Sequence, residues 1–309
     1  MYRTEKTAIL LATYNGEKYI SEQIESILEQ SDVEWMLYIH DDGSTDRTVE
    51  IIEKYAKMYP RQICIVDGAP TGGAKQNFFY LFSCIEAPYY MCCDQDDVWL
   101  PEKIEITKKE MVHLEKDDEE KPCLVFTELK VVDENLDIIN EKMSIYQGLD
   151  CKKLSVNRAI IQNVVTGCTM MVNRALREEF MKITDYTDVL MHDWWAFLVA
   201  ARFGKIVFIE DATILYRQHG NNGVGARDSG SPIYLMKRML QGEEIKKSLA
   251  DTRAQAKLFV QKYGESKDSL ISQYAQLSKS GKMKRLRFYI EKDVKKSTFA
   301  RNIGLWIWG

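Results

Sequence analysis

The stretch APYYMCCDQDDVWLPEK, residues 87–103, decides how this chain folds. Its apolar run YYMCC predicts a buried strand, because a strand covered on both faces is apolar throughout. The acids Asp94, Asp96 and Asp97 follow directly, and Pro101 suits the first turn of a helix. A strand that ends in acids and leads into a helix is one unit of an α/β fold.

The same unit recurs along the first 120 residues. Strand and helix alternate four times, which predicts a mainly parallel, Rossmann-like sheet with helices on both faces. The strands are expected at 7–15, 34–44, 62–68 and 87–93, and the helices at 17–30, 44–59 and 101–116, with a further helix after the Gly-rich loop that opens the segment 71–85.

Polar residues gather where three of these strands end. In open parallel sheets, ligands bind outside the carboxyl ends of the strands, so we expect these residues to converge on one crevice. After residue 120 the alternation breaks, and we expect the second half to supply the other wall. The strand-end residues are Thr13, Tyr14 and Asn15, then Asp41, Asp42 and Gly43, and then Asp94, Asp96 and Asp97.

Charge divides the chain into an acidic body and a basic tail. The net charge is −4, yet the stretch from residue 233 to the end carries 17 Lys and Arg against 7 Asp and Glu. We therefore expect a main domain over 1–232, with halves at about 1–120 and 121–232, and a basic helical extension over 233–309.

Location and several function classes can be predicted from what the sequence lacks. The seven cysteines are odd in number and form no CxxC, as expected of reduced cysteines in a cytoplasmic protein. The N-terminus does not read as a signal peptide, and no apolar run is long enough to span a bilayer. Without GxGxxG after the first strand or GxxxxGK[ST] anywhere, dinucleotide oxidoreductases and P-loop enzymes are disfavoured.

The acids at 94–97 need a counterion if they lie together at the end of a buried strand. Mg²⁺ or Mn²⁺ is the simplest one, because both prefer oxygen ligands and are commonly shared with substrate phosphates. The alternative is that the acids only decorate a loop. Asp41 and Asp42 leave a similar choice between an ordinary turn and a carboxylate that accepts the ring N–H of uracil or thymine.

Two later segments add candidates. Asp193, in MHDWW, falls at a predicted helix N-terminus, where the helix dipole favours the ionised form, and could take a proton from a hydroxyl or simply cap the helix. Arg217 and His219, in LYRQHGNN, end a strand, where they could contact diphosphate or complete a metal shell. The alternative for both is a structural role.

Together these segments resemble a known family. LLATYNGEKYISEQIESIL, HDDGSTDRT, DQDDVWLPEK, TGCTMMVNR, HDWW and YRQHGNN, in this order over residues 7 to about 225, are similar to family 2 glycosyltransferases. The nearest resemblance is to the bacterial rhamnosyltransferase-like subgroup, which builds capsule, O-antigen or cell-wall polysaccharide.

The resemblance implies a GT-A fold, a nucleotide-sugar donor, a divalent metal and inversion at the anomeric carbon. It implies that Asp193 is the catalytic base. His219 matches a residue that approaches metal or diphosphate in the family. The implied metal ligands are Asp94, Asp96, Asp97 and His219, and the implied nucleotide-sugar contacts are Thr13, Asn15, Asp41, Asp42, Lys75, Asn77, Asp94 and Arg217.

Donor and acceptor follow from the subgroup. His192 stands before the base where many relatives have Glu, a variant familiar in rhamnosyltransferase-like members, so L-rhamnose from dTDP-rhamnose is the expected donor sugar. The alternatives are a UDP-hexose donor, a nucleotide-diphosphate-binding protein without activity, and a sugar nucleotidyltransferase. The expected acceptor is a polyprenyl-lipid-linked glycan, and nucleic acid is not an expected partner.

The basic extension then suggests peripheral attachment to the inner face of the cell membrane. Its last part mixes Lys and Arg with Phe288, Tyr289, Phe299, Trp306 and Trp308, a pattern typical of interfacial helices. The alternatives are a solvated helical face or a contact between subunits.

Overall fold

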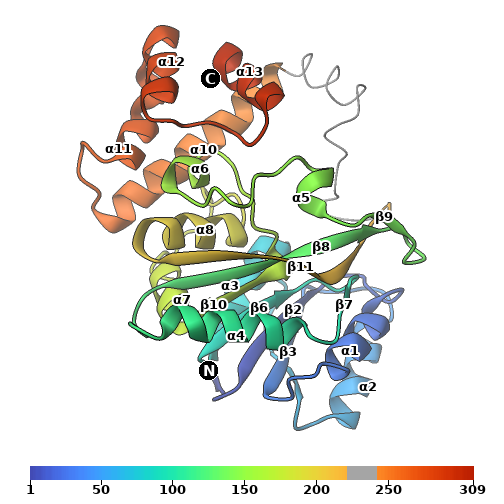
Figure 1. Cartoon of the computed structure of the whole chain (residues 1–309). Coiled ribbons are helices and arrows are strands. Elements are labelled where there is room, and N and C mark those ends of the chain that lie inside the picture. The colour runs from blue at the N-terminus through green and yellow to red at the C-terminus, as the bar shows by residue number, and fades with distance from the viewer. Residues whose placement is uncertain (221–241) are drawn as a thin grey trace.

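A computed structural model describes residues 1–220 and 242–309 (Figure 1). Its main feature is a nine-stranded mixed sheet. In spatial order the strands are β4 (Ile63–Ile65), β3 (Trp35–Asp41), β2 (Thr7–Thr13), β6 (Tyr89–Cys93), β10 (Met170–Asn173), β8 (Cys123–Val132), β11 (Lys205–Arg217) and β7 (Val98–Trp99), with β9 (Ile138–Asn140) paired to β8. A separate two-stranded sheet pairs β1 (Tyr2–Arg3) with β5 (Ile85–Glu86).

The sheet changes character at β6. Strands β4, β3, β2 and β6 run parallel, as the alternation of strand and helix predicts. Strand β10 then pairs antiparallel with both β6 and β8, so the second half of the chain joins the sheet in the opposite direction. The carboxyl end of β6, which leads into the acids, therefore lies where the two halves of the domain meet.

Helices cover both faces of the parallel half because its strands are apolar on both sides. Along β2, Ala8 and Leu10 belong to one buried cluster, and Ile9 and Leu11 belong to the other. The second cluster takes in residues of α1 (Ile20–Leu28), α2 (Thr48–Met58) and α4 (Lys103–Glu115), whereas the first takes in residues of α3 (Ala74–Cys84), α7 (Arg174–Phe180) and α8 (His192–Phe203).

Helix α8 ends at Phe203, directly before a glycine. Gly204 follows it and lies so close to Pro122 that a Cβ at this position would stand 1.9 Å from the Pro122 carbonyl oxygen. The chain then turns directly into β11, whose first residue donates its N–H to the same carbonyl at 2.9 Å. Two short helices, α5 (Met143–Tyr146) and α6 (Val156–Ala159), and the 3₁₀ turn Gly167–Thr169 complete this half.

The C-terminal extension packs on α6 and α8 (Figure 1). Trp195 of α8 lies with its ring centroid 5.6 Å from that of Phe259, and Arg158 donates to the carbonyl of Lys296 at 3.1 Å. The extension thereby shares one apolar core with the main domain. Its helices are α10 (Gly242–Tyr263), α11 (Leu270–Ala275), α12 (Lys282–Glu291) and α13 (Phe299–Trp308), with a 3₁₀ turn at Gln276–Lys279.

The predicted helical extension is confirmed, but the predicted boundary between 232 and 233 lies outside the described residues and stays a prediction. Within residues 1–220 and 242–309, no helix combines the length and the apolar character that crossing a membrane requires.

Candidate functional site

The ends of β2 and β3 are tied together by side chains. Thr13 donates its hydroxyl to Asp41 Oδ1 at 2.9 Å, and Asn15 Oδ1 accepts the N–H of Thr45 at 2.8 Å. Asn15 has φ of 48°, a left-handed conformation that asparagine tolerates better than most residues. Gln95 completes the junction, because its side chain bonds both the N–H and the carbonyl of Tyr14, at 2.8 and 2.9 Å.

Asp41 and Asp42 organise two different loops. Asp41 accepts the N–H groups of Gly43 and Ser44 at 3.0 and 2.7 Å, which closes the turn after β3. Asp42 reaches the loop before α3, where it accepts the N–H of Gly73 at 2.6 Å and also bonds Thr71 and Gly72. Partial burial works against ionisation of Asp42, but these hydrogen bonds outweigh it and lower its pKa.

The acids after β6 differ in exposure, because Asp94 and Asp96 are partly buried and Asp97 is fully buried. Asp96 Oδ2 lies 2.7 Å from His219 Nε2, and both side chains retain some exposure. Asp97 is fully buried, with Oδ1 accepting the N–H of Arg217 at 3.1 Å. Its Oδ2 has no hydrogen-bond partner in the described part of the chain. Potential ligand atoms of Asp94, Asp97 and Cys168 all lie within 4.8 Å of one another.

This group of carboxylates is electrostatically costly without a cation. Burial, with repulsion from Asp96 and Asp193, raises the pKa of Asp94 to about 7. Burial and the same kind of repulsion raise the pKa of Asp97. Lys103 is a buried cation that interacts electrostatically with Asp97, and its Nζ lies 4.7 Å from the centre of the Trp99 ring without a hydrogen-bond partner among residues 1–220 and 242–309.

The donor set fits a hard divalent cation. Carboxylate oxygens from Asp94, Asp96 and Asp97 are the ligands that Mg²⁺ and Mn²⁺ prefer, and Mn²⁺ also accepts an imidazole such as His219. The buried Oδ2 of Asp97 lacks a partner that a cation would supply. Cys168 fits less well, because burial raises the pKa of its thiol and thiolates suit softer metals.

Asp193, in the second half of the chain, lies close enough to Asp94 for the two carboxylates to repel each other. It is the second residue of α8 and only 8% exposed, and the N-cap of that helix is Met191, so Asp193 is not a plain cap. Its Oδ1 accepts the N–H of Trp194 at 2.6 Å, and its carboxylate also bonds the Asn163 side chain. Burial is the main cause that raises the pKa of Asp193 to about 7.

His192, which precedes Asp193, points into the core. Its ring centroid lies 4.2 Å from that of Phe78, and neither ring nitrogen has a hydrogen-bond partner in the ranges that the structure covers. Burial lowers the pKa of His192 to about 3, so the imidazole is neutral at physiological pH. An ionised glutamate in this apolar place would lack a counterion, which explains why histidine fits here.

The side chain of Arg217 is buried and contacts the backbone of the loop that carries the acids. Its guanidinium is 3% exposed and bonds the carbonyl of Asp96 at 2.9 Å, the carbonyl of Glu134 at 2.7 Å and the Glu22 carboxylate. It also stacks 4.5 Å from the centre of the Tyr19 ring. These contacts fix the loop that carries the acids, and a direct contact of Arg217 with diphosphate stays a prediction.

Lys75 and Asn77 also hold parts of the protein together. Lys75 Nζ donates to the carbonyls of Tyr186 and Val189 at 2.8 and 2.7 Å, which fastens α3 to the segment before α8. Asn77 is 1% exposed and bonds both the ring and the carbonyl of His40. The geometry therefore does not support their predicted contacts with the nucleotide, which stay predictions.

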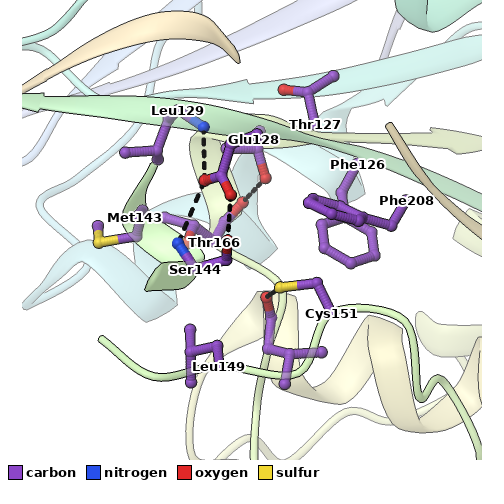
Figure 2. A pocket seen from close by; sticks show the side chains of 12 residues that line it. Phe126, Thr127, Glu128, Leu129, Met143, Ser144, Leu149, Cys151, Thr166 and Phe208 are labelled. Carbon is purple, nitrogen blue, oxygen red and sulfur yellow. Dashed lines mark hydrogen bonds between the residues drawn. The ribbon is translucent and has the colours of Figure 1, made fainter. Parts of the chain in front are cut away.

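A small cavity in the second half surrounds Glu128 (Figure 2). The buried Glu128 carboxylate accepts N–H groups of Leu129 at 3.0 Å and Ser144 at 3.3 Å, and also the Ser144 hydroxyl. The cavity measures about 10 Å³, enough for a single water and too small for a sugar. Glu128 therefore anchors α5 to β8.

Sequence reasoning missed Gln95, Lys103, Asn163 and Glu128. Gln95 lies inside the acidic motif, and its amide could have been considered as a link between strand ends. The other three carry no local signal, because each acquires its role from partners distant along the chain. The fold and the polar residues at the ends of its strands are typical of α/β enzymes, in which ligands bind at the carboxyl edge of the sheet.

Comparisons with known proteins agree with this class. The profile of Glycosyl transferase family 2 matches residues 8–178. The dTDP-rhamnosyl transferase RfbG of Shigella flexneri is 34% identical over 236 residues, which cover 72% of this chain and 76% of that protein. The chain therefore belongs to glycosyltransferase family 2 and is a glycosyltransferase, as the sequence motifs predict.

Solved structures confirm the GT-A fold. S. aureus TarS, in complex with UDP, superposes with a TM-score of 0.52 at 18% identity over 92% of this chain and 78% of that chain. The mannosyltransferase PcManGT from Pyrobaculum calidifontis, in complex with GDP-Man and Mn²⁺, gives a TM-score of 0.54 at 15% identity over 96% of this chain and 78% of that chain. At these identities the likeness concerns the fold alone.

Proposed function

We propose that this glycosyltransferase transfers L-rhamnose from dTDP-rhamnose to a hydroxyl of a growing bacterial surface glycan, with inversion at the anomeric carbon. The similarity to a protein described as a dTDP-rhamnosyl transferase supports the donor. The observation that carries the reaction type is the placement of Asp193, which is close enough to Asp94 for the two carboxylates to repel each other. In this proposal Asp193, from the second half of the domain, therefore lies near the acids that follow β6 in the first half.

The acids hold a divalent metal in this proposal. Asp96 and His219 keep some exposure, whereas Asp97 is fully buried. When bound, Mg²⁺ or Mn²⁺ would offset the negative charge that grows on the departing nucleoside diphosphate. Arg217 keeps the acidic loop in place through its bond to the Asp96 carbonyl.

Asp193 acts as the general base. Its carboxylate accepts the proton of the acceptor hydroxyl while that oxygen forms a bond to C1 of the sugar. The bond from C1 to the diphosphate oxygen breaks on the opposite face, and the bonding electrons leave with the diphosphate. A base with a pKa of about 7 is well matched to this task near neutral pH.

The nucleotide lies over the ends of β2 and β3. The turn there is shaped by Thr13, Asn15 and Asp41. Asp42 accepts the ring N–H of the nucleotide's thymine or uracil. Among the residues described, Oδ2 of Asp42 accepts only the N–H of Gly73, so this oxygen has a lone pair left for the ring N–H of the nucleotide. The segments around this site are held in position by Lys75, Asn77 and Arg217.

The C-terminal extension provides attachment to an anionic membrane surface that carries a lipid-linked acceptor. Its large apolar side chains Met283, Ile290 and Phe299 are 78, 65 and 72% exposed. Exposed Lys282, Lys284 and Lys292 lie on or beside α12, which also carries Met283 and Ile290, whereas Phe299 begins α13. Apolar side chains together with lysines favour an interfacial position.

Calorimetric binding of dTDP and UDP, each with Mn²⁺ and with EDTA, tests the donor. Metal-dependent preference for dTDP is expected, followed by formation of an inverted rhamnoside from dTDP-rhamnose, observed by NMR of the anomeric proton. Preference for UDP would favour a UDP-hexose donor instead. Binding without any turnover of the sugar nucleotide would favour a non-catalytic nucleotide-diphosphate-binding protein.

A further inference from the structure

The chain reaches the proposed base through a segment without regular structure. Residues 186–190, called the approach segment below, form neither helix nor strand and lead through the N-cap Met191 into α8. Asp193 is the second residue of that helix, so its position depends on where the approach segment places the helix start. A segment outside helices and sheets has no ladder of backbone hydrogen bonds, so other contacts must hold it in place.

A side chain from the first half of the domain holds the approach segment. Lys75, in the first turn of α3, donates from Nζ to the carbonyl of Tyr186 at 2.8 Å and to that of Val189 at 2.7 Å. Tyr186 also stacks on Phe79 of the same helix, with ring centroids 4.0 Å apart and ring planes inclined by 9°. Helix α3 therefore fixes the approach segment at two carbonyl groups and one ring.

The charge of Lys75 is directed at this segment. Asp185 and Asp188 attract its ammonium group electrostatically, and its two hydrogen bonds go to backbone carbonyls of the segment. An ammonium group has three N–H donors, so two of the three are used within the protein. These contacts give Lys75 a role that requires no nucleotide.

A second side chain, from the C-terminal extension, holds the end of the approach segment. Gln255 of α10 is 1% exposed, and its Oε1 accepts the N–H of Leu190 at 2.9 Å. Its Nε2 has no hydrogen-bond partner in the part of the chain that the structure describes. Burying an amide with an unused donor is unfavourable, so the contribution of Gln255 lies in its bond to Leu190.

The two contacts come from different parts of the chain and meet on one short segment. We propose that Lys75 and Gln255 are positioning residues for Asp193, because they fix the approach segment and with it the start of α8. A displacement of about 1 Å at a reacting group can lower a rate about 100-fold. The inference rests on the proposed function, in which Asp193 is the base. It gives the extension a part in catalysis in addition to attachment.

Steady-state release of dTDP from dTDP-rhamnose, with water as the acceptor, tests the inference in variants that each lose one contact. Lys75→Met removes the donor, and Gln255→Met removes the acceptor at similar side-chain length. We expect each substitution to lower kcat about tenfold or more. The KM for dTDP-rhamnose and the Kd of dTDP with Mn²⁺, measured by calorimetry, should stay unchanged. Lys75→Arg and Gln255→Glu, which keep the donor and the acceptor, should retain most of the rate.

A double substitution shows whether Lys75 acts through the base. Effects of residues that act as one unit are not additive, so in the Asp193→Asn background the loss caused by Lys75→Met should shrink to about twofold or less. A purely structural role of Lys75 would lower the rate by the same factor in both backgrounds. That outcome would overturn the inference.

The matched controls lose a bond to a carbonyl elsewhere. Lys205→Met loses the bond to Leu114 at 2.8 Å, and Gln273→Met loses the bond to Asp268 at 2.7 Å, and both should keep the wild-type kcat. Unchanged kcat in Lys75→Met and Gln255→Met would overturn the inference, as would weaker dTDP binding by Lys75→Met at unchanged kcat. Absence of turnover by a wild type that binds dTDP would instead overturn the proposed function on which the inference rests.

Discussion

Asp96 and His219 meet at 2.7 Å although 123 positions separate them along the chain. Asp96 follows β6 in the first half of the domain, and His219 follows β11 in the second half. Their contact places a carboxylate and an imidazole side by side, and both groups are ligands for first-row metals. His219, in the last of the family motifs along the chain, therefore lies next to an acid of the motif at residues 94–97.

The substitution Asp96→Asn should remove metal-dependent nucleotide binding. The amide is a much weaker cation ligand than the carboxylate, so the gain in dTDP affinity on adding Mn²⁺ should fall by about 10–100-fold, as measured by calorimetry. Affinity in EDTA should stay the same. Asp117→Asn, at an exposed position, is the control, and an intact response to Mn²⁺ in Asp96→Asn would rule out Asp96 as a ligand.

Replacing the base should separate binding from transfer. Asp193→Asn keeps the shape and the acceptor for the N–H of Trp194 but cannot take up a proton. We expect the transfer rate from dTDP-rhamnose to fall by about 10²–10⁴-fold, with the dissociation constant for dTDP nearly unchanged. A variant that retains a tenth or more of the wild-type rate would show that another group is the base.

The same substitution should stabilise the protein at high pH. The pKa of Asp193 is raised to about 7, so the folded state binds more protons than the unfolded state, and stability decreases as pH rises from about 4 to about 7. Asp193→Asn removes this penalty and should raise the free energy of unfolding at pH 8 by roughly 1–4 kcal/mol.

Urea unfolding in EDTA at pH 8 and at pH 4.5 tests this prediction. The gain should nearly disappear at the lower pH, where the wild-type carboxyl is protonated in the folded state. Asp117→Asn should show no such dependence. Equal effects at the two pH values would mean that burial does not perturb Asp193.

Glu128 should matter for stability and little for nucleotide binding. Glu128→Ala leaves the N–H and hydroxyl of Ser144 without their acceptor, which should cost roughly 1–3 kcal/mol in the free energy of unfolding. The matched control is Glu141→Ala, whose carboxylate is 65% exposed and paired only with Lys130 among the residues described. Unfolding in urea that does not distinguish the two variants would contradict the anchoring role.

The exposed apolar side chains of the extension should govern attachment to vesicles. The double variant Ile290→Ser, Phe299→Ser should reduce recovery on phosphatidylcholine vesicles containing about one-third phosphatidylglycerol. Ile138→Ser, Ile145→Ser is the control, because these side chains are equally apolar and exposed but lie in the main domain. Equal recovery of both double variants would assign the exposed residues of the extension another role.

Local sequence patterns were sufficient to predict the parallel half of the fold and the polar residues at the strand ends. An apolar run followed by Asp94, or the start of α8 at His192, is specified by neighbours in the chain. The inward position of Asp97 and the enclosed guanidinium of Arg217 could not be predicted in this way. Arg217 pairs with Glu22, 195 positions away, and such pairs arise only when the sheet has formed.

During synthesis, β6 leaves the ribosome well before its neighbour β10. One edge of Tyr89–Cys93 can pair with β2 at once, because the parallel half is built from consecutive units. The other edge waits for Met171–Asn173, which arrive only after β8 and β9. An apolar strand with an unpaired edge is a template for incorrect pairing. The nascent chain is therefore most in need of a chaperone while the residues between β6 and β10 are being added.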